Sequence, residues 1–461
     1  MFAPKALLAT LALSSSLTFA QGIVLNDQNL RTDLNWLNQQ GVIQISTSTW
    51  PMSGDEIQRA LSQAKVSNNT QQKVIDAVVA HLNANNQLLK ASLFAETDQK
   101  NIPQAFGDQQ KAQYQAGLEL NAGNQNWDAK IRVNAEKDPQ IDNDQDVNVE
   151  GSYIAAKLWN QWLIAGQIPT YWGPAHDGSL IRGDASRPVY GVTMQRAEQQ
   201  AFSNKWLSWI GPWQYQAFAG QLHDYDAVPD AKLIGLRVTA QPLPYLELGA
   251  SRAFQWGGED RPESLNSLWD AFVGNKDNGG TGEPDPSNQI AGFDARLRLP
   301  GVQFYGELYG EDQANYLPSQ VGYRAGMYIP NLAGNGSWDL TMETAKTGHN
   351  WYYHGRYQNG WTYHGQIMGD QMGPDAQAFF AKVNHYWTGE RSMGIFVKRT
   401  SRNHEFSAAP TDTEVGVTGQ YKVSPNTYLN GELGLSHGTN QLGSDDTTNS
   451  TFVNLAMTKM F

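Results

Sequence analysis

The sequence predicts a mainly β chain: a transmembrane antiparallel β-barrel of about 18 strands, preceded by a small N-terminal helical bundle. First, apolar and polar residues alternate in runs of about ten from Tyr114 onward, the length that a tilted membrane-spanning strand needs. Second, short turns alternate with long connectors, as in outer-membrane barrels. Third, Val453, Leu455 and Met457 alternate at the end of the chain, which finishes on Phe461.

Residues 1–20 have the features of a secretory signal peptide. Lys5 supplies a positive charge, residues 6–17 are mostly apolar, and Thr18-Phe19-Ala20 ends on a small residue, which predicts cleavage after Ala20. The apolar segment is too short to span a bilayer core of about 30 Å.

Residues 21–110 are expected to form a helical subdomain. Three helix starts are predicted, at Asn26-Asp27, at the capping-box sequence 53–56 and at Thr70. Residues 42–45 are a candidate for a short strand between the first two helices.

Residues 111–461 are assigned to the barrel. Short connectors such as Pro300-Gly301 and Asn359-Gly360 carry turn residues. The runs count to about nineteen, and because bacterial single-chain barrels have an even number of strands, eighteen are expected. Counting back from Phe461 places the connector at 170–189 on the outer face. The long connectors are about 170–189, 254–289, 310–321, 369–376, 401–412 and 437–449.

The composition excludes several classes of protein. The chain has no Cys, so it has neither disulfides nor thiolate metal sites. The net charge of −12 argues against nucleic acid as a partner, because phosphates would be repelled. After residue 20 no run approaches 18 apolar residues, so no transmembrane helix is expected. A mean hydropathy of −0.52 is compatible with strands that alternate lipid-facing and lumen-facing side chains.

Several blocks rich in Gly, Pro and aromatic residues occur in order along the chain. They are Gly166-Gln-Ile-Pro-Thr-Tyr-Trp172-Gly-Pro-Ala-His-Asp177 with Arg187-Pro188, Trp209-Ile-Gly-Pro-Trp213, Gln255-Trp-Gly-Gly258, Trp351-Tyr-Tyr-His354 and Asn359-Gly-Trp-Thr-Tyr-His364. These blocks resemble the capsule assembly proteins of the Wzi family, and the match covers most of residues 110–400. One departure is Tyr171, where the family often has a second Trp, and the N-terminal helices match only in character. The final strand ending in Phe resembles the insertion signal of outer-membrane barrels.

The resemblance implies an eighteen-stranded barrel in the outer membrane of a Gram-negative bacterium, with its loops facing the exterior. It also implies that the helical subdomain is periplasmic, near the inner end of the barrel. The role it implies is lectin-like: surface loops hold exported capsular or extracellular polysaccharide on the cell.

Two loops contain the residue types that bind sugars, namely flat aromatic faces and planar polar groups. Arginine also suits the carboxylates of acidic polysaccharides. In the second loop Glu259 supplies a further polar group of this kind, and Tyr316 and Asp375 are weaker additions. An alternative is that the first loop folds inward and closes the lumen, with Asp177 and Arg187 paired structurally. The predicted polysaccharide-binding residues are Trp172, Asp177, Arg182, Asp184 and Arg187 in the first loop, and Trp256, Asp260, Arg261 and Trp269 in the second.

Other candidates favour simpler interpretations. Trp206, Trp209 and Trp213 adjoin a Gly-Pro turn and are expected in an interfacial girdle. His354 and His364 flank a Tyr-rich hairpin, but no converging set of metal ligands is evident. His404 and Ser407 could suggest a hydrolase, but spacing alone does not supply the required nucleophile–base geometry.

We therefore expect a non-catalytic polysaccharide anchor that has no cofactor or metal. The alternative is a porin or diffusion channel for small solutes, which would differ in having an open polar lumen. The expected partners are polysaccharide and outer-membrane lipid, with the polysaccharide export machinery as a further candidate. The protein is expected to be a monomer.

Overall fold

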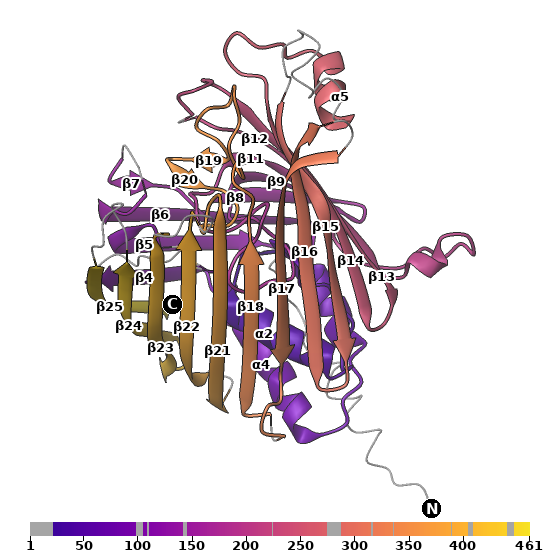
Figure 1. The fold of residues 1–461 in the computed structure, drawn as a ribbon. Helices are drawn as coiled ribbons and strands as arrows, with labels where there is room; N and C mark the ends of the chain where they lie inside the picture. The colour runs from indigo at the N-terminus through magenta and orange to yellow at the C-terminus, as the bar shows by residue number, and fades with distance from the viewer. Residues whose placement is uncertain are drawn as a thin grey trace, which may run out of the picture.

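Eighteen antiparallel strands close a barrel, and this confirms the predicted fold class. Figure 1 shows the barrel with the N-terminal part of the chain, in indigo, at its lower end. The computed structural model describes residues 22–97, 105–107, 110–141, 145–223, 225–273, 287–314, 317–334, 336–388, 390–403, 409–439 and 447–461. The signal peptide predicted at 1–20 lies outside these residues, as do Tyr316, His404 and Ser407.

Each barrel strand pairs with its neighbours in the chain except where β25 meets β4. The strands are β4 (Leu89–Glu96), β5 (Ala112–Gly123), β6 (Trp127–Pro139), β8 (Tyr153–Leu158), β9 (Gln161–Gln167), β11 (Tyr190–Arg196), β12 (Trp213–Gln221), β13 (Lys232–Leu243), β14 (Leu246–Trp256), β15 (Ser287–Leu299), β16 (Val302–Ala314), β17 (Leu317–Ile329), β18 (Trp338–Lys346), β21 (Ala376–Thr388), β22 (Arg391–Arg402), β23 (Thr411–Ser424), β24 (Thr427–Thr439) and β25 (Thr447–Met460). The two-residue strand β7 (Val147–Asn148) extends the pairing of β6.

The barrel begins earlier than the boundary placed at 110/111. Strand β4 pairs with β25, with Met460 opposite Lys90, and this pairing closes the barrel. Sequence reading missed β4 because it lies directly after a helix in a region rich in Gln and Asn. The Asn359-Gly360 turn was also misplaced. It lies within the long connection 347–375, where only the two-residue strands β19 (Thr362–Tyr363) and β20 (Gln366–Ile367) pair.

The two ends of the barrel differ as expected. Residues 300–301 make one of the short turns between strands. The connection 168–189, between β9 and β11, lies at the opposite end, which is the end predicted for it. Short turns face the periplasm and long loops face the exterior in outer-membrane barrels.

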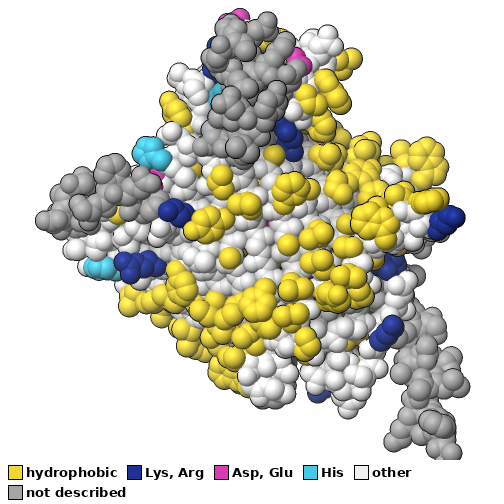
Figure 2. Space-filling model, turned by 45° about the vertical axis from the view of Figure 1, so that its right-hand side comes forward, with side chains coloured by type: hydrophobic (Ala, Val, Ile, Leu, Met, Phe, Trp, Pro, Cys, Tyr) yellow, Lys and Arg dark blue, Asp and Glu magenta, His cyan; other side chains and the backbone are white. Residues whose placement is uncertain are grey.

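The outer surface of the barrel is apolar. Ile131 and Val133 on β6 are exposed, whereas Lys130 and Asn134 on the same strand are buried inside. Figure 2 shows hydrophobic side chains over one face of the barrel, with few charged side chains among them. This alternation matches strands between lipid and lumen. Among the described residues, no helix is both long enough and apolar enough to span a membrane.

The N-terminal segment, residues 22–86, packs three helices at the short-turn end. They are α2 (Gln28–Gln39), α3 (Gly54–Ser62) and α4 (Asn69–Asn85). Leu34, Ile57 and Val78 meet in one apolar core. The Nε2 of Gln39 donates to the carbonyl of Leu299, 2.6 Å away, beside the short turn between β15 and β16. This contact fixes the helices to that end of the barrel (Figure 1).

The positions of the predicted helix starts are confirmed, but the capping residues differ in part. Asp27 caps α2 by accepting from the Leu30 main-chain nitrogen, as expected. Asn68, rather than Thr70, caps α4. Ser53 is the N-cap of α3 but makes no side-chain cap bond, and the Glu56 carboxylate pairs with Arg59.

The short strand expected at 42–45 does not form. The carbonyl of Val42 accepts from Lys65 and that of Ile45 accepts from the Asn38 side chain, so neither joins a ladder there. The short strands of the N-terminal segment lie elsewhere. They are β1 (Ile23–Val24), β2 (Thr49–Trp50) and β3 (Met52–Ser53).

Candidate functional site: the inward loop and its recess

Residues 168–189, which we call the inward loop, turn into the barrel. Within the loop, the strand β10 (Tyr171–Trp172) pairs with β2 of the N-terminal segment. The main-chain nitrogen of Trp172 donates to the carbonyl of Arg182, 3.0 Å away, and this bond closes the loop on itself. The loop and the N-terminal segment therefore meet inside the lumen.

Arg31 on α2 holds this junction together. Its Nη2 lies 2.8 Å from the carbonyl oxygen of Ala175 and also donates to the carbonyls of Gly173 and Pro174. The guanidinium lies over the rings of Phe106 and Tyr171, at 4.3 and 5.1 Å from their centroids. A single buried cation thus donates to three loop carbonyls, one of which, that of Ala175, also accepts from the Tyr171 hydroxyl.

Trp172 is a core residue in this structure. Its side chain is fully buried, and its Nε1 donates to Gln216 on β12 at 2.5 Å. Gly235 on β13 leaves the room for it, because a Cβ there would lie 2.6 Å from the Trp172 ring. The predicted stacking surface is therefore covered by the barrel wall.

Asp177 is also buried, and its partners come from the barrel wall. Its carboxylate lies 2.9 Å from Lys398 Nζ and 3.9 Å from Arg324 Nη1. Arg324 in turn pairs with Glu343 and Asp370. The alternative interpretation is thus right that the loop folds inward but wrong about the pairing, because Asp177 does not pair with Arg187.

Arg187 has two carboxylate partners near the other end of the loop. Its guanidinium lies 2.8 Å from Glu136 and 2.9 Å from Glu150, and it also donates to the carbonyl of Ile141. The side chain is fully buried. A cation that makes these bonds fixes the loop to β6 and to the turn before β8.

Asp184 joins three parts of the chain. It accepts from Asn26 Nδ2 at 2.6 Å and from the main-chain nitrogen of Gly107 at 2.7 Å. Its own carbonyl accepts from the Lys111 ammonium. These contacts make Asp184 a structural acceptor in the present conformation.

Arg182 differs from the other loop residues. Its guanidinium lies over the rings of Phe218 and Trp172, at 4.7 and 5.9 Å. It is 4% exposed, and its Nη1 has no hydrogen-bond acceptor among the described residues. Burial lowers the pKa of Arg182 to about 10, with the charge of Asp184 opposing the shift, so the group stays charged at neutral pH.

A recess lies beside Arg182, between the inward loop and the wall formed by β5 and β6. Four cationic side chains and two carboxylates line it. The charged lining residues are Lys111, Arg132, Arg182, Arg187, Glu150 and Asp184. The recess brings together three of the five residues predicted in the first loop.

The second predicted group is more exposed. Trp269, on α5 (Leu265–Val273), is 63% exposed and lies 5.9 Å from Phe272. Asp260 is exposed at a positive φ, and Arg261 lies 4.6 Å over the Tyr357 ring. Trp256 is mostly buried, with Phe254 and Ala271. We call Asp260, Arg261 and Trp269 the outer rim group.

The remaining candidates take structural places. Glu259 is exposed beside the outer rim group. Asp375 is buried and lies 3.5 Å from His349. His354 Nδ1 accepts from the main-chain nitrogens of Arg356 and Tyr357, which makes it a turn cap. The part of the chain that the structure describes holds no cluster of three or more His, Cys, Asp or Glu able to bind a metal.

Trp206 and Trp209 project from the connection between β11 and β12. They are 75% and 67% exposed; Trp206 precedes the short 3-10 helix η1 (Ser208–Ile210), and Trp209 lies within it. Trp213 is only half-buried and lies under the Arg196 guanidinium at 4.0 Å. The expected girdle position stays a prediction.

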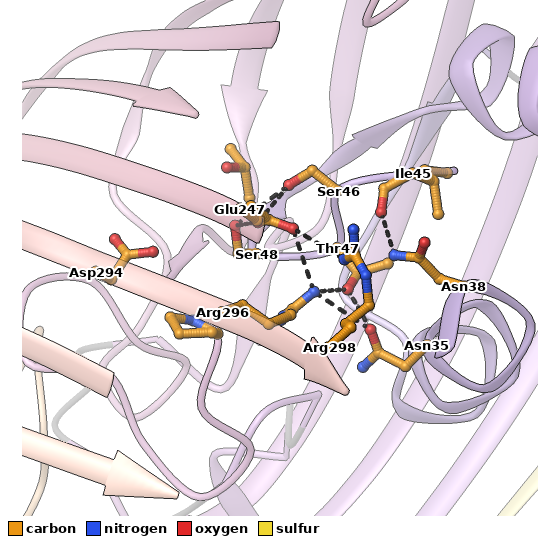
Figure 3. A network of polar contacts seen from close by, with 12 residues as sticks. Asn35, Asn38, Ile45, Ser46, Thr47, Ser48, Glu247, Asp294, Arg296 and Arg298 are labelled. Atoms are coloured by element: carbon orange, nitrogen blue, oxygen red, sulfur yellow. Dashed lines mark hydrogen bonds and ion pairs between the residues drawn. The ribbon is translucent and has the colours of Figure 1, made fainter. Parts of the chain in front are cut away.

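Sequence reading missed the charges on the inner face of the barrel wall. Figure 3 shows Glu247 beside Ser46 and Ser48 of the N-terminal segment, with Arg296 and Arg298 nearby. Glu247 accepts from Ser46 at 2.7 Å, and Arg296 donates to Thr47 at 2.7 Å. One available signal was the spacing Asp294-x-Arg296-x-Arg298, which places three charges on one face of a strand.

The fold and site define a class: an eighteen-stranded membrane barrel whose lumen is occupied by an N-terminal segment and an inward loop. The comparisons give the family. A model of the capsule assembly protein Wzi family matches residues 85–452, and the chain belongs to this family.

Two relatives support this. Wzi of Escherichia coli, an outer-membrane protein involved in group 1 capsule assembly and a carbohydrate-binding β-barrel, is 36% identical, with a TM-score of 0.85, and the match covers 95% of this chain and 99% of that one. An uncharacterised 55.8 kDa protein in the cps region of Klebsiella pneumoniae is 40% identical over 469 residues, covering 95% of this chain and 90% of the relative. The barrel and the family place this protein in the outer membrane.

Proposed function

We propose that this protein is a lectin-like anchor that binds capsular or extracellular polysaccharide at the cell surface during capsule assembly, without catalysis. The observation that carries the proposal is the occupied lumen: Arg31, Asp177 and Arg187 bind the inward loop to the helices and to the wall. An occupied barrel is a rigid support for surface loops. The carbohydrate-binding E. coli relative supports the ligand class.

We assign different roles to the two sets of predicted residues. The outer rim group supplies the contact surface, because Trp269 is exposed and can stack on a sugar ring while Asp260 and Arg261 take hydroxyls. Trp172, Asp177, Asp184 and Arg187 hold the inward loop, and Trp256 supports α5. Arg182 lines the recess.

The partners follow from the surfaces. The apolar outer face of the barrel contacts outer-membrane lipid, and the long loops face the exterior. We propose that the protein acts as a monomer and takes polysaccharide from the export machinery. Light scattering of the purified protein in detergent, corrected for bound detergent, tests whether the protein is a monomer.

The test of function is binding of the host's own exopolysaccharide to purified protein, with surface retention measured in cells. Trp269→Ala should weaken both, whereas Trp387→Ala, which changes an exposed Trp near the short turns, should change neither. Equal loss in both variants, or no polysaccharide binding by the wild type, would contradict the anchor. A steady large conductance in planar bilayers would favour the porin.

A further inference from the structure

The recess beside Arg182 contains a cation, Arg182 itself, that the carboxylates of the recess do not pair with. Asp184 is bonded to Asn26 and Gly107, and Glu150 is bonded to Arg187. Neither lies within ion-pair distance of Arg182, and among the described residues Arg182 makes no ion pair.

A buried cation without an anionic partner is costly, because the protein interior replaces its hydration poorly. Arginine cannot escape this cost by losing its proton at neutral pH. Phe218 and Trp172 stabilise the guanidinium through their π-systems, but they supply no acceptor, and its Nη1 lacks one among the described residues. The edge of a guanidinium is the part that pairs with planar or tetrahedral oxyanions.

Neighbouring residues add to the positive charge around Arg182. Arg132 lines the same recess and is only half-buried, and Lys111 lies at the start of β5. Gln115 and Asn134 also line the recess, and their amides are already hydrogen-bonded: Asn134 to Arg132, Asn148 and the carbonyl of Glu150, and Gln115 to Glu136. The arrangement is a cationic centre in a polar setting, which suits one charged group.

We propose that the recess is a binding site for a single oxyanion, with Arg182 as the principal donor and Arg132 and Lys111 supporting the charge. The ligand is a carboxylate of an acidic sugar or a phosphate group. The inference that the ligand is a carboxylate of the anchored glycan rests on the proposed function, whereas the inference of phosphate binding does not. Binding would neutralise the buried charge and tighten the inward loop against β5 and β6.

The experiment uses the full purified protein in a non-ionic detergent and a phosphate-free buffer at low salt. Glucuronate, inorganic phosphate and neutral glucose are titrated separately, and affinity and thermal stability are measured. The wild type should bind and be stabilised by at least one anion but not by glucose. Arg182→Gln should weaken that binding about 10- to 100-fold, because charge-assisted hydrogen bonds are lost. Arg182→Lys should retain a weaker, more salt-sensitive response.

The matched control is Arg391→Gln, which changes an exposed arginine at the other end of the barrel. It should bind the anions as the wild type does. Failure of the wild type to distinguish either anion from glucose overturns the proposal even if Arg182→Gln does not fold. An equal response in Arg182→Gln also overturns it.

The two proposals fail separately. Polysaccharide binding that survives in Arg182→Gln, without any anion effect, leaves the anchor intact and removes the oxyanion site. Anion binding by a protein that does not bind the host polysaccharide leaves the site intact and removes the anchor.

Discussion

Replacing Arg187 with alanine should destabilise the inward loop. In the proposed arrangement Arg187 holds this loop and does not itself contact the polysaccharide. The substitution removes a fully buried guanidinium that lies 2.8 Å from Glu136 and 2.9 Å from Glu150. Two buried carboxylates then lose their cation, and the expected loss of folding free energy is about 3–5 kcal/mol. The control is Lys232→Ala, which breaks an exposed pair with Glu263 and should cost about 0–1 kcal/mol.

The assay is urea unfolding in detergent followed by Trp fluorescence, with limited proteolysis reporting on the inward loop. The loss should depend on pH. Burial already raises the pKa of Glu150, although Arg187 opposes the shift, so removing Arg187 should raise it further. A carboxyl whose folded pKa lies above its unfolded value loses stability as pH rises between the two values. The variant should therefore recover part of its stability as the pH falls toward about 5.

The result decides what Arg187 does. A large loss of stability with weaker polysaccharide retention fits a residue that holds the loop. Loss of retention with stability within about 1 kcal/mol of the wild type would mean direct contact with the glycan and would refute the structural role.

Four further predictions follow. Trp269→Ala should reduce polysaccharide affinity about tenfold in a binding assay while the unfolding midpoint stays unchanged, because the ring is mostly exposed. Gly235→Val should displace the Trp172 ring and lower the thermal midpoint, whereas Gly419→Ala, which has open space around it, should not. Trp206→Phe and Trp209→Phe should each remove fluorescence that brominated phospholipids quench in vesicles, and absence of such quenching in the wild type would contradict the girdle position. The helical subdomain should be more stable near pH 6 than near pH 8 in urea unfolding. Burial raises the pKa of Asp33 to about 7, and Asp27 raises the pKa of His81 despite the burial of His81. Because both pKa values are raised in the folded state, stability is lost as pH rises, and an unchanged unfolding midpoint would contradict this.

The barrel was predictable because its signals are local and repeated. Alternation along a strand such as β6 reports directly which side chains face lipid. Strand β4 was not predicted because the residue composition does not change between the helical sequence before it and the strand itself. The turn at Asn359-Gly360 was misplaced because a hairpin signal specifies a turn but not whether its strands join the wall.

The site was only partly predictable for a different reason. Trp, Asp and Arg in a Gly-Pro loop suit sugar binding and suit a packed interior equally well, since both need aromatic faces and paired charges. The partners decide between these roles, and they lie far away in the chain: Asp177 meets Lys398, and Asp184 meets Asn26. No local pattern encodes those contacts.

The charges on the inner face of the barrel wall determine which charged side chains of the loop are paired. A wall lined by Arg237, Arg296 and Arg324 requires carboxylates near these arginines, because buried cations without partners are unstable. Asp294 and Glu247, on the wall itself, meet that requirement for Arg237 and Arg296, and Asp177, on the inward loop, contributes to meeting it for Arg324. Arg182 is a cation on the loop itself, and the wall offers it aromatic rings but no carboxylate within ion-pair distance among the described residues. The same reasoning that makes Asp177 structural therefore makes Arg182 the loop residue with capacity for a ligand.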